Sequence, residues 1–129
     1  MLGIVIVSHS KKLTEGVREL IEQMAGGKVP TACAGGSAGR LGTDATLIRK
    51  AIEEAYSEDG VLIFVDFGSA VLSAKTAITL LEPEKRDRVK IADAPLVEGA
   101  FIASVEASMG KGLEEVLHST VESKNLKKS

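Results

Sequence analysis

The residues best suited to chemistry are a histidine and an aspartate that each follow an apolar run. His9 comes just after the run 2–7, and Asp66 comes directly after the run 61–65. A carboxylate beside an imidazole fixes the tautomer by accepting one ring N–H, and it makes the other ring nitrogen more basic. Such a nitrogen is a directed nucleophile.

Small polar residues accompany both side chains. Ser8 and Ser10 flank His9, while Gly68 and Ser69 follow Asp66 and precede a helical pattern. Backbone N–H groups at the start of a helix suit an anion, and a serine hydroxyl adds a further donor. We therefore expect Ser10, Gly68 and Ser69 to bind phosphate, and the set as a whole suggests phosphoryl transfer through a phosphohistidine.

Each of these residues also has a plainer interpretation. The plainer interpretation of His9 is a solvated loop residue, and that of Asp66 is the cap of the following helix. His118 has no matching acid nearby in the sequence, and we expect it on the surface. Lys11 and Lys12 are interpreted as solvated side chains that can also steer an acidic partner or a phosphate.

Strand-like and helix-like segments alternate along the chain, which predicts an α/β fold. Strands are expected at 2–7, 29–34, 61–65 and 89–92, with two helices after the last of them. This order predicts an open parallel sheet of about four strands with helices on both faces. His9 and Asp66 then lie at the carboxyl edge of the sheet, where such folds bind ligands, and they meet if the first and third strands are neighbours.

Local signals refine this outline. The first helix is expected to bury one face, formed by Leu13, Val17, Leu20, Ile21 and Met24. The glycine-rich loop 35–42 leads to Thr43, which is expected to cap the next helix. We expect a single domain over residues 1–123 and a flexible tail at 124–129.

Composition excludes several classes of function. The net charge is −2 and aromatic residues make up 3% of the chain, so nucleic acid is not expected as a partner. No apolar run approaches the ~18 residues of a membrane span, and no leader is visible, so we expect a cytoplasmic protein that does not contact membrane. The single cysteine, Cys33, is expected to be buried and inert.

No nucleotide-binding motif is present. The glycines at 36, 39 and 42 do not have the spacing of the dinucleotide fingerprint, and no phosphate loop with Gly-Lys-Ser/Thr occurs. We expect the protein to need neither a cofactor nor a metal for the phosphoryl step.

Four passages together resemble a known family. They are Gly3-Ile4-Val5-Ile6-Val7-Ser8-His9-Ser10, Ala34-Gly35-Gly36 with Gly42-Thr43-Asp44, Val65-Asp66-Phe67-Gly68-Ser69-Ala70 and Ala94-Pro95-Leu96-Val97-Glu98-Gly99-Ala100. In order and spacing the chain resembles the phosphotransfer subunits of phosphoenolpyruvate-dependent dihydroxyacetone kinases, which are mannose-type IIA domains of the bacterial phosphotransferase system.

The resemblance implies a role for each part of the site. His9 would take a phosphoryl group from phospho-HPr and pass it to ADP on the nucleotide-binding kinase subunit, with Asp66 orienting the imidazole. Gly68 and Ser69 would lie beside the phosphoryl group. The resemblance also implies a homodimer and, because fused carrier domains are lacking, the use of free HPr. We further expect a modest apolar rim around the His9 loop, where both partners must dock.

Three other functions stay open. A mannose-type sugar-transport IIA component is the nearest, although Ser10 and the Gly68-Ser69-Ala70 segment depart from its usual pattern. A receiver-like signalling domain would use Asp66 as the phosphoacceptor but needs further acids for magnesium. A hydrolase would pair Ser8 or Ser10 with His9, yet adjacent loop residues rarely reach the geometry required.

Overall fold

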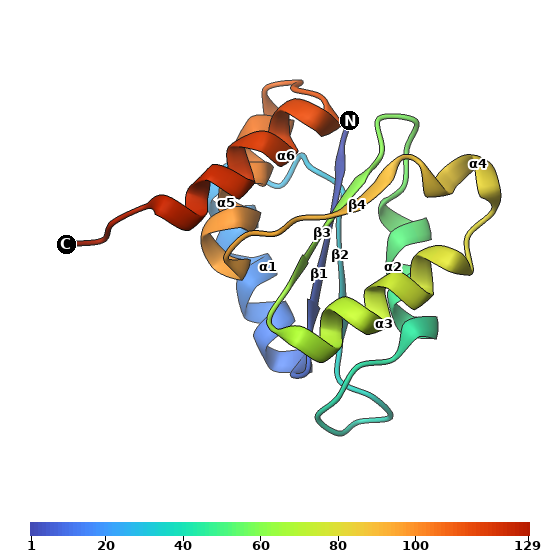
Figure 1. Cartoon of the computed structure of the whole chain (residues 1–129). Helices are drawn as coiled ribbons and strands as arrows, with labels where there is room; N and C mark the ends of the chain where they lie inside the picture. Colours follow the sequence, from blue (N-terminus) through green and yellow to red (C-terminus); the bar gives the residue numbers. More distant parts are fainter.

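The computed structural model describes residues 1–129, and its elements alternate as expected (Figure 1). The strands are β1 (Gly3–Ser8), β2 (Thr31–Gly35), β3 (Val61–Val65) and β4 (Val89–Ile91). The helices are α1 (Lys11–Ala25), α2 (Ala45–Ala55), α3 (Gly68–Thr79), α4 (Pro83–Arg86), α5 (Leu96–Ser108) and α6 (Leu113–Glu122), followed by the 3₁₀ turn η1 (Ser123–Asn125).

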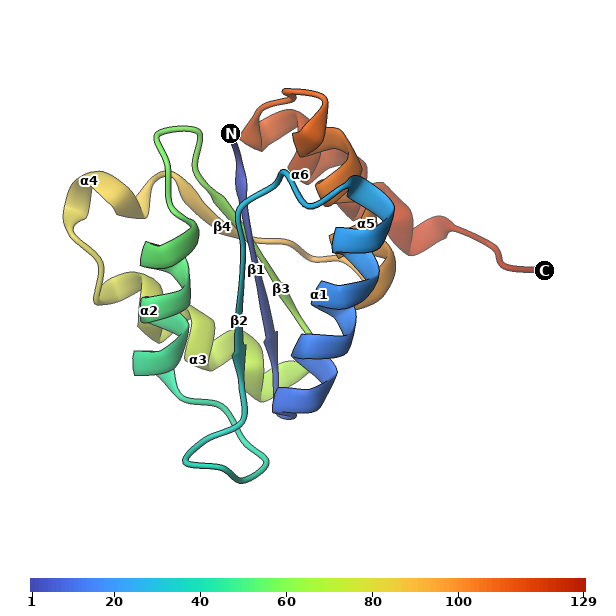
Figure 2. The same ribbon diagram turned by 180° about the vertical axis from the view of Figure 1, so that it is seen from behind.

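The four strands form one parallel sheet in the order β2-β1-β3-β4. Helices α2 and α3 cover one face of this sheet, and α1, α5 and α6 cover the other (Figures 1 and 2). The α/β fold with an open parallel sheet is therefore confirmed. The strand order also places β1 beside β3, which is the condition that His9 and Asp66 need in order to meet.

The sheet separates two hydrophobic cores. Val5 and Val7 of β1 point into the core shared with α2 and α3, whereas Ile4 and Ile6 point into the core shared with α1 and α5. All six residues of β1 are buried, because a central parallel strand is covered on both faces. Burial of each large aliphatic side chain contributes about 1.5–3 kcal/mol, so the strand that leads to His9 is firmly anchored.

The first helix starts at a serine cap and ends at a glycine, but its apolar face is narrower than expected. Ser10 caps α1 by accepting a hydrogen bond from the N–H of Leu13 at 3.2 Å, and Gly26 ends it with a φ of 79°. The buried residues of α1 are Thr14, Val17 and Ile21. The expectation that Leu13, Leu20 and Met24 are also buried is wrong, because α1 packs against β2 and α5 with a narrow stripe.

One further local expectation differs from the structure. Asp44, not Thr43, caps α2, and its carboxylate accepts the N–H of Thr46 at 2.8 Å. The Thr43 hydroxyl instead pairs with that of Ser73 on α3 at 2.6 Å. Pro83 lies past the end of α3 and starts the short helix α4, a position that suits its fixed φ.

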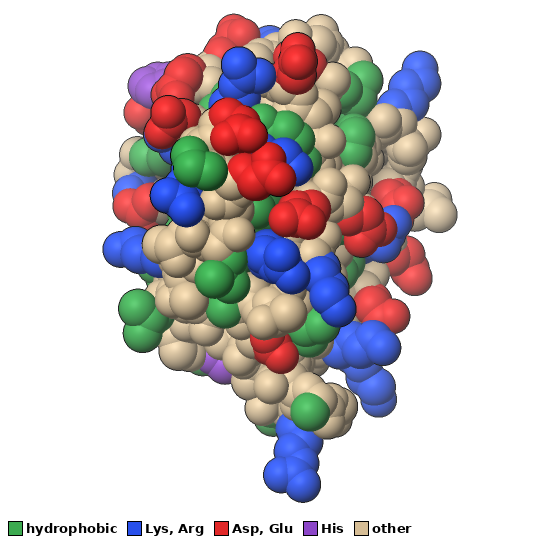
Figure 3. Space-filling model, turned by 90° about the vertical axis from the view of Figure 1, so that its right-hand side faces the viewer, with side chains coloured by type: hydrophobic (Ala, Val, Ile, Leu, Met, Phe, Trp, Pro, Cys, Tyr) green, Lys and Arg blue, Asp and Glu red, His purple; other side chains and the backbone are tan.

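The chain ends on the outside of the molecule. Residues after η1 project away from the sheet (Figure 1), and Lys124 pairs with Asp93 at 2.8 Å. The flexibility of residues 124–129 and the domain boundary at 123 stay predictions. Charged side chains of both signs intermingle on the face shown in Figure 3, as the small net charge implies.

Candidate functional site

The register of the central strands places the two predicted residues at the same edge of the sheet. Val7 of β1 pairs with Val65 of β3, so Asp66 lies opposite the segment where β1 ends and His9 begins its turn toward α1. Both side chains therefore leave from the ends of buried strands. Their relative position is set first by the sheet hydrogen bonds between β1 and β3.

The imidazole of His9 is held by the carboxylate of Asp66. The Nδ1 atom lies 3.0 Å from Oδ1 and 3.1 Å from Oδ2, and the backbone N–H of His9 donates to Oδ2 at 2.9 Å. An ionised carboxylate only accepts hydrogen bonds, so Nδ1 carries a proton, and in the neutral imidazole Nε2 then presents a lone pair. The side chains of His9 and Asp66 are 20% and 9% exposed, so the ring reaches solvent while its partner is shielded.

Further donors hold the carboxylate. The buried Ser8 hydroxyl donates to Oδ2 at 2.9 Å, and the N–H of Phe67 donates to Oδ1 at 2.8 Å. Burial alone would raise the pKa of Asp66, but the hydrogen bonds from His9, Ser8 and Phe67 outweigh it and hold that pKa below its usual range. The carboxylate is therefore charged at neutral pH. It does not cap α3, whose N-cap residue is Phe67.

The second ring nitrogen faces the start of α3. The Ser69 hydroxyl lies 2.5 Å from Nε2 of His9. The backbone N–H groups of Gly68 and Ser69 form no hydrogen bond within the protein, whereas that of Ala70 bonds to the carbonyl of Phe67 at 2.9 Å. Two free N–H groups and the positive end of the helix dipole thus lie beside the nucleophilic nitrogen, where they can receive an anion.

An exposed aromatic ring covers the imidazole. Phe67 stacks on His9 with ring centroids 4.3 Å apart and an angle of 12° between the planes. Its side chain is 63% exposed and belongs to neither core. Leu13, Leu41 and Leu72, on the elements around His9, are also exposed. These exposed side chains agree with the expected apolar rim, which as a docking surface stays a prediction.

The loop between β2 and α2 contributes to this edge through its backbone. It projects beyond the carboxyl ends of the strands and forms the lowest part of the molecule in Figures 1–3. Ser37 and Arg40 exchange backbone hydrogen bonds of 2.8 and 2.9 Å around Ala38 and Gly39, which have φ of 50° and 79°, as in a type I′ turn. The N–H of Gly42 donates to the His9 carbonyl at 2.9 Å, so the loop supports the His9 turn.

The structure therefore brings together His9, Asp66 and Ser69, with the N-terminus of α3 at Gly68. The Ser10 hydroxyl caps α1 instead of pointing to Nε2, and its contact with phosphate stays a prediction. Sequence reasoning gave Phe67 no role in the site, and it considered Ser8 only as a hydrolase nucleophile and not as a donor to Asp66. The clue to Ser8 was a polar residue ending an otherwise apolar strand, and the clue to Phe67 was an aromatic residue in a loop.

Two other reactive side chains lie apart from the site. Cys33 is half-buried, and its thiol lies 3.4 Å from the carbonyl of Thr14. Burial raises the pKa of Cys33, which keeps the thiol protonated. The expectation of complete burial is thus wrong. His118 is exposed on α6, as expected.

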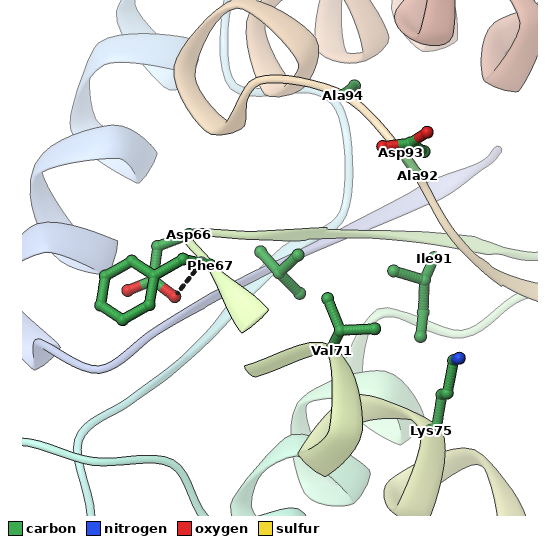
Figure 4. A pocket seen from close by; sticks show the side chains of 9 residues that line it. Asp66, Phe67, Val71, Lys75, Ile91, Ala92, Asp93 and Ala94 are labelled. Carbon is green, nitrogen blue, oxygen red and sulfur yellow. Dashed lines mark hydrogen bonds between the residues drawn. The ribbon is translucent and has the colours of Figure 1, made fainter. Parts of the chain in front are cut away.

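A cavity of about 410 Å³ adjoins the site. Figure 4 shows Asp66 and Phe67 at one end of it and Lys75 and Ile91 at the other. Neither His9 nor Ser69 lines this cavity. The imidazole of His9 therefore lies outside this cavity, and its side chain is 20% exposed.

No three His, Cys, Asp or Glu side chains converge as a metal site would require. In addition, none of the helices combines the length and the apolar character that crossing a membrane demands.

A family comparison agrees with this geometry. The family model EIIA-man, described as the PTS system fructose IIA component, matches residues 3–117. The chain belongs to the EIIA-man family. His9, Asp66 and Ser69 all lie within the matched segment of this EIIA-man protein.

Several relatives have one name in common. A Listeria innocua protein named "PEP-dependent dihydroxyacetone kinase 2, phosphoryl donor subunit DhaM" is 46% identical over 118 residues, covering 91% of this chain and 94% of the relative. The DhaM proteins of Klebsiella michiganensis and Escherichia coli K12 are 43% and 44% identical over 91% of the EIIA-man chain. The chain spans only 26% of the length of each of these two longer proteins.

Solved structures show the same fold. The crystal structure of a protein of unknown function, EF1359, superposes with a TM-score of 0.85 at 41% identity, covering 94% of this chain and 93% of the other. An EIIA component of the phosphotransferase system from Streptococcus agalactiae has a TM-score of 0.70 at 16% identity, with 98% and 97% coverage. At that identity the second likeness supports the EIIA-man fold alone.

Proposed function

We propose that this EIIA-man protein is the phosphoryl carrier of a dihydroxyacetone kinase. His9 accepts a phosphoryl group from phospho-HPr and passes it to ADP on the nucleotide-binding kinase subunit. The names of the DhaM relatives support this proposal. The observation that carries it is the pair formed by His9 and Asp66, which leaves Nε2 unprotonated, accessible and beside two free backbone N–H groups.

The first transfer begins with the lone pair of Nε2. This nitrogen attacks phosphorus, a new N–P bond forms, and the N–P bond of the donor phosphohistidine breaks with its electron pair returning to the donor ring. The Nδ1 proton of His9 stays in its hydrogen bond to Asp66, so the positive charge that develops on the ring lies 3.0 Å from a carboxylate. No proton has to leave the site.

The start of α3 receives the phosphoryl oxygens. The Ser69 hydroxyl, which lies 2.5 Å from Nε2 in the free protein, must rotate away from that lone pair and can then donate to a phosphoryl oxygen. The N–H groups of Gly68 and Ser69 supply two more donors. Catalysis of this kind rests on positioning and charge stabilisation, which the two backbone N–H groups provide without reorganisation.

The second transfer reverses the first. A terminal oxygen of ADP attacks the phosphorus, the N–P bond breaks, and its electron pair returns to Nε2, which leaves as a neutral imidazole with Nδ1 still protonated. The chain thus ends each cycle in its starting state. It acts as one subunit of a phosphotransferase, while the kinase partner binds the nucleotide.

A reconstitution tests the carrier step. The chain is incubated with labelled phosphoenolpyruvate, enzyme I and HPr, and acid-labile, alkali-stable label is expected on the parent. His118→Ala is the matched control because it removes the other histidine, which is exposed on α6. His118→Ala should be labelled like the parent, and His9→Ala not at all. Label on His9→Ala would refute the proposal.

The final acceptor is tested in the same mixture. Addition of the nucleotide-binding subunit with ADP, the third subunit and dihydroxyacetone should discharge the label, whereas a hexose with sugar-transport components should not. The opposite result would assign the chain to sugar transport. A receiver-like role is disfavoured because both oxygens of Asp66 already accept hydrogen bonds.

We also propose a homodimer. The sheet has two edge strands, β2 and β4, each paired on one side only, and a second copy can add at such an edge. Sedimentation equilibrium at micromolar concentration should give twice the chain mass of 13.5 kDa. A single-chain mass there would overturn this part of the proposal.

A further inference from the structure

Three side chains at the carboxyl edge of the sheet have the arrangement of a serine nucleophile, its base and its orienting acid. The Ser69 hydroxyl lies 2.5 Å from Nε2 of His9, and Nδ1 of the same ring lies 3.0 Å from Oδ1 of Asp66. The serines adjacent to His9 do not take this place. Ser8 is fully buried and donates to Asp66, and Ser10 caps α1.

The protonation states agree with the distances. Since the carboxylate of Asp66 is charged, Nδ1 of His9 donates to it, and in the neutral ring Nε2 is then the acceptor. The hydrogen bond between Nε2 and Ser69 is therefore donated by the hydroxyl. This is the direction in which a base removes a proton from a serine nucleophile.

An anion site completes the set. Ser69 is the second residue of α3, and its own backbone N–H and that of Gly68 have no partner in the protein. Donors at this position can stabilise the oxyanion that forms when a serine attacks a carbonyl carbon. Nucleophile, base, orienting acid and oxyanion donors are all exposed or partly exposed at one edge.

We propose that, beyond phosphoryl transfer, the unphosphorylated protein has acyl-transfer activity through Ser69 toward small activated carboxylic esters. The Ser69 oxygen attacks the carbonyl carbon, its proton moves to Nε2 of His9, and that proton leaves with the departing alcohol. Water then attacks the acyl-serine with Nε2 again taking a proton, the carboxylic acid is released, and the Ser69 hydroxyl regains its proton. The products are one acid and one alcohol for each ester and water consumed.

Phosphorylation and acyl transfer exclude each other at this site. Both need the same lone pair, because a phosphoryl group on Nε2 of His9 removes the base that Ser69 requires. The chain therefore has a reactive serine only when it carries no phosphate.

The test is the reaction of the isolated chain with p-nitrophenyl acetate and with a fluorophosphonate probe. We expect a covalent adduct on Ser69, located by mass spectrometry, and none in Ser69→Ala. His9→Ala should lower the rate of adduct formation by roughly 100-fold or more, as loss of a general base does. Ser73→Ala is the matched control because Ser73 lies on the same helix and pairs with Thr43, not with an imidazole. It should react like the parent.

Three results would overturn the proposal. In the first, no adduct forms on Ser69. In the second, Ser69→Ala hydrolyses the ester as fast as the parent. In the third, Ser69 is labelled equally in the parent and in His9→Ala. In the second case an imidazole alone performs the hydrolysis. Circular dichroism of each variant confirms that it is folded.

A final arm separates this proposal from the carrier function. Chain phosphorylated by HPr should lose reactivity at Ser69, and unchanged reactivity would contradict the role of Nε2 as base. Absence of phosphorylation would instead refute the carrier function, while the ester assay would still decide the reactivity of Ser69.

Discussion

Nδ1 of His9 lies 3.0 Å from Oδ1 of Asp66, although 57 residues separate them in the chain. The two strands that bring them together are buried and in parallel register, with Val7 opposite Val65. The pair is thus preorganised by the sheet, and a protein partner that docks at this edge meets a ring whose tautomer and direction are already set.

Replacing the acid tests the value of that preorganisation. Asp66→Asn keeps the shape of the side chain but removes the charge that stabilises a protonated Nδ1. We expect phosphorylation of His9 by phospho-HPr to slow by roughly 10- to 100-fold, the usual effect of losing the acid that orients a histidine. The measurement is the rate of label transfer, with the imidazole tautomer followed by nitrogen NMR.

The matched control is Asp59→Asn. Asp59 is exposed and pairs with the N-terminal amine, so the same chemical change is made far from His9. It should leave the rate of label transfer unchanged. If Asp66→Asn transfers label as fast as this control, the carboxylate has no part in directing the ring.

The stacked pair of Phe67 and His9 gives a second prediction. Hydrogen bonds to Asp66 and Ser69 act in the plane of the imidazole, whereas Phe67 limits tilting out of that plane. Stacked aromatic pairs contribute about 0.5–1.5 kcal/mol, so Phe67→Ala should slow transfer by about 2- to 12-fold. Stability should change little because the side chain is exposed.

Two substitutions separate stacking from docking. Phe67→Tyr keeps the flat ring and should restore the rate, while Phe67→Leu keeps an apolar contact without a ring. Full activity of Phe67→Leu would show that the side chain serves only as a contact for partners. The nitrogen NMR signals of His9 report the orientation of the ring without any partner.

The lowered pKa of Asp66 predicts how stability depends on pH. Near pH 4 the unfolded chain binds a proton to this carboxyl more readily than the folded protein does, so the free energy of unfolding rises with pH there. The stabilisation is complete above the unfolded pKa, about 3.9, and is lost as pH falls through the lower folded value. Asp66→Asn lacks this dependence.

Urea unfolding of both proteins, from about pH 6 down to about pH 3, measures the effect. The difference in unfolding free energy between the parent and Asp66→Asn should narrow as the pH falls below the aspartate range. Parallel curves would mean that the hydrogen bonds to Asp66 add no stability. The unfolding free energy of Ser8→Ala should depend less on pH than that of the parent, because this variant lacks a buried donor to the carboxylate.

The part of the site that lies at strand ends, His9 and Asp66, could be predicted from the sequence. Continuous apolar runs identify buried parallel strands, and their carboxyl ends identify the edge at which His9 and Asp66 lie. Local sequence patterns do not determine the order of strands in a sheet. The contact between His9 and Asp66 therefore depends on β1 lying beside β3, as it does in the structure. The position of Ser69 against Nε2 depends on the first turn of α3 and could only be seen in three dimensions.

The errors have a common physical cause. Thr43 and Asp44 are both good caps; Asp44 takes the cap, while the Thr43 hydroxyl pairs with Ser73 on another helix. In the same way, Leu13 fits the helical period of α1 but lies beyond the narrow stripe that packs on the sheet. Local sequence patterns identify the residues that can cap a helix or be buried, and tertiary contacts decide which of them do so.

Substitution by alanine is expected to lower stability at one glycine and to raise it at another. A Cβ atom at Gly35 would lie 2.6 Å from Cα of Lys11 and 2.8 Å from the Ser10 carbonyl, where β2 packs against the start of α1. Gly35→Ala should therefore unfold more easily and slow labelling of His9. A Cβ at Gly16 meets nothing within 4 Å, so Gly16→Ala should stabilise the chain by about 0.5–1 kcal/mol. Urea unfolding compares them, and equal stability would contradict the close approach at Gly35.

The lysines at the start of α1 are expected to lower stability and to favour phosphorylation of His9. Lys11 and Lys12 occupy its first two positions, where the helix dipole favours acids, and neither forms an ion pair. Lys12→Glu should therefore stabilise the protein by about 0.3–1 kcal/mol. It should also slow phosphorylation of His9, most at low salt, because the arriving phosphoryl group is anionic and rim charges govern association. Lys28→Glu, beyond the other end of α1, makes the same charge change and should leave the rate unaltered. A faster or salt-independent reaction of Lys12→Glu would show that this lysine has no part in attracting the donor.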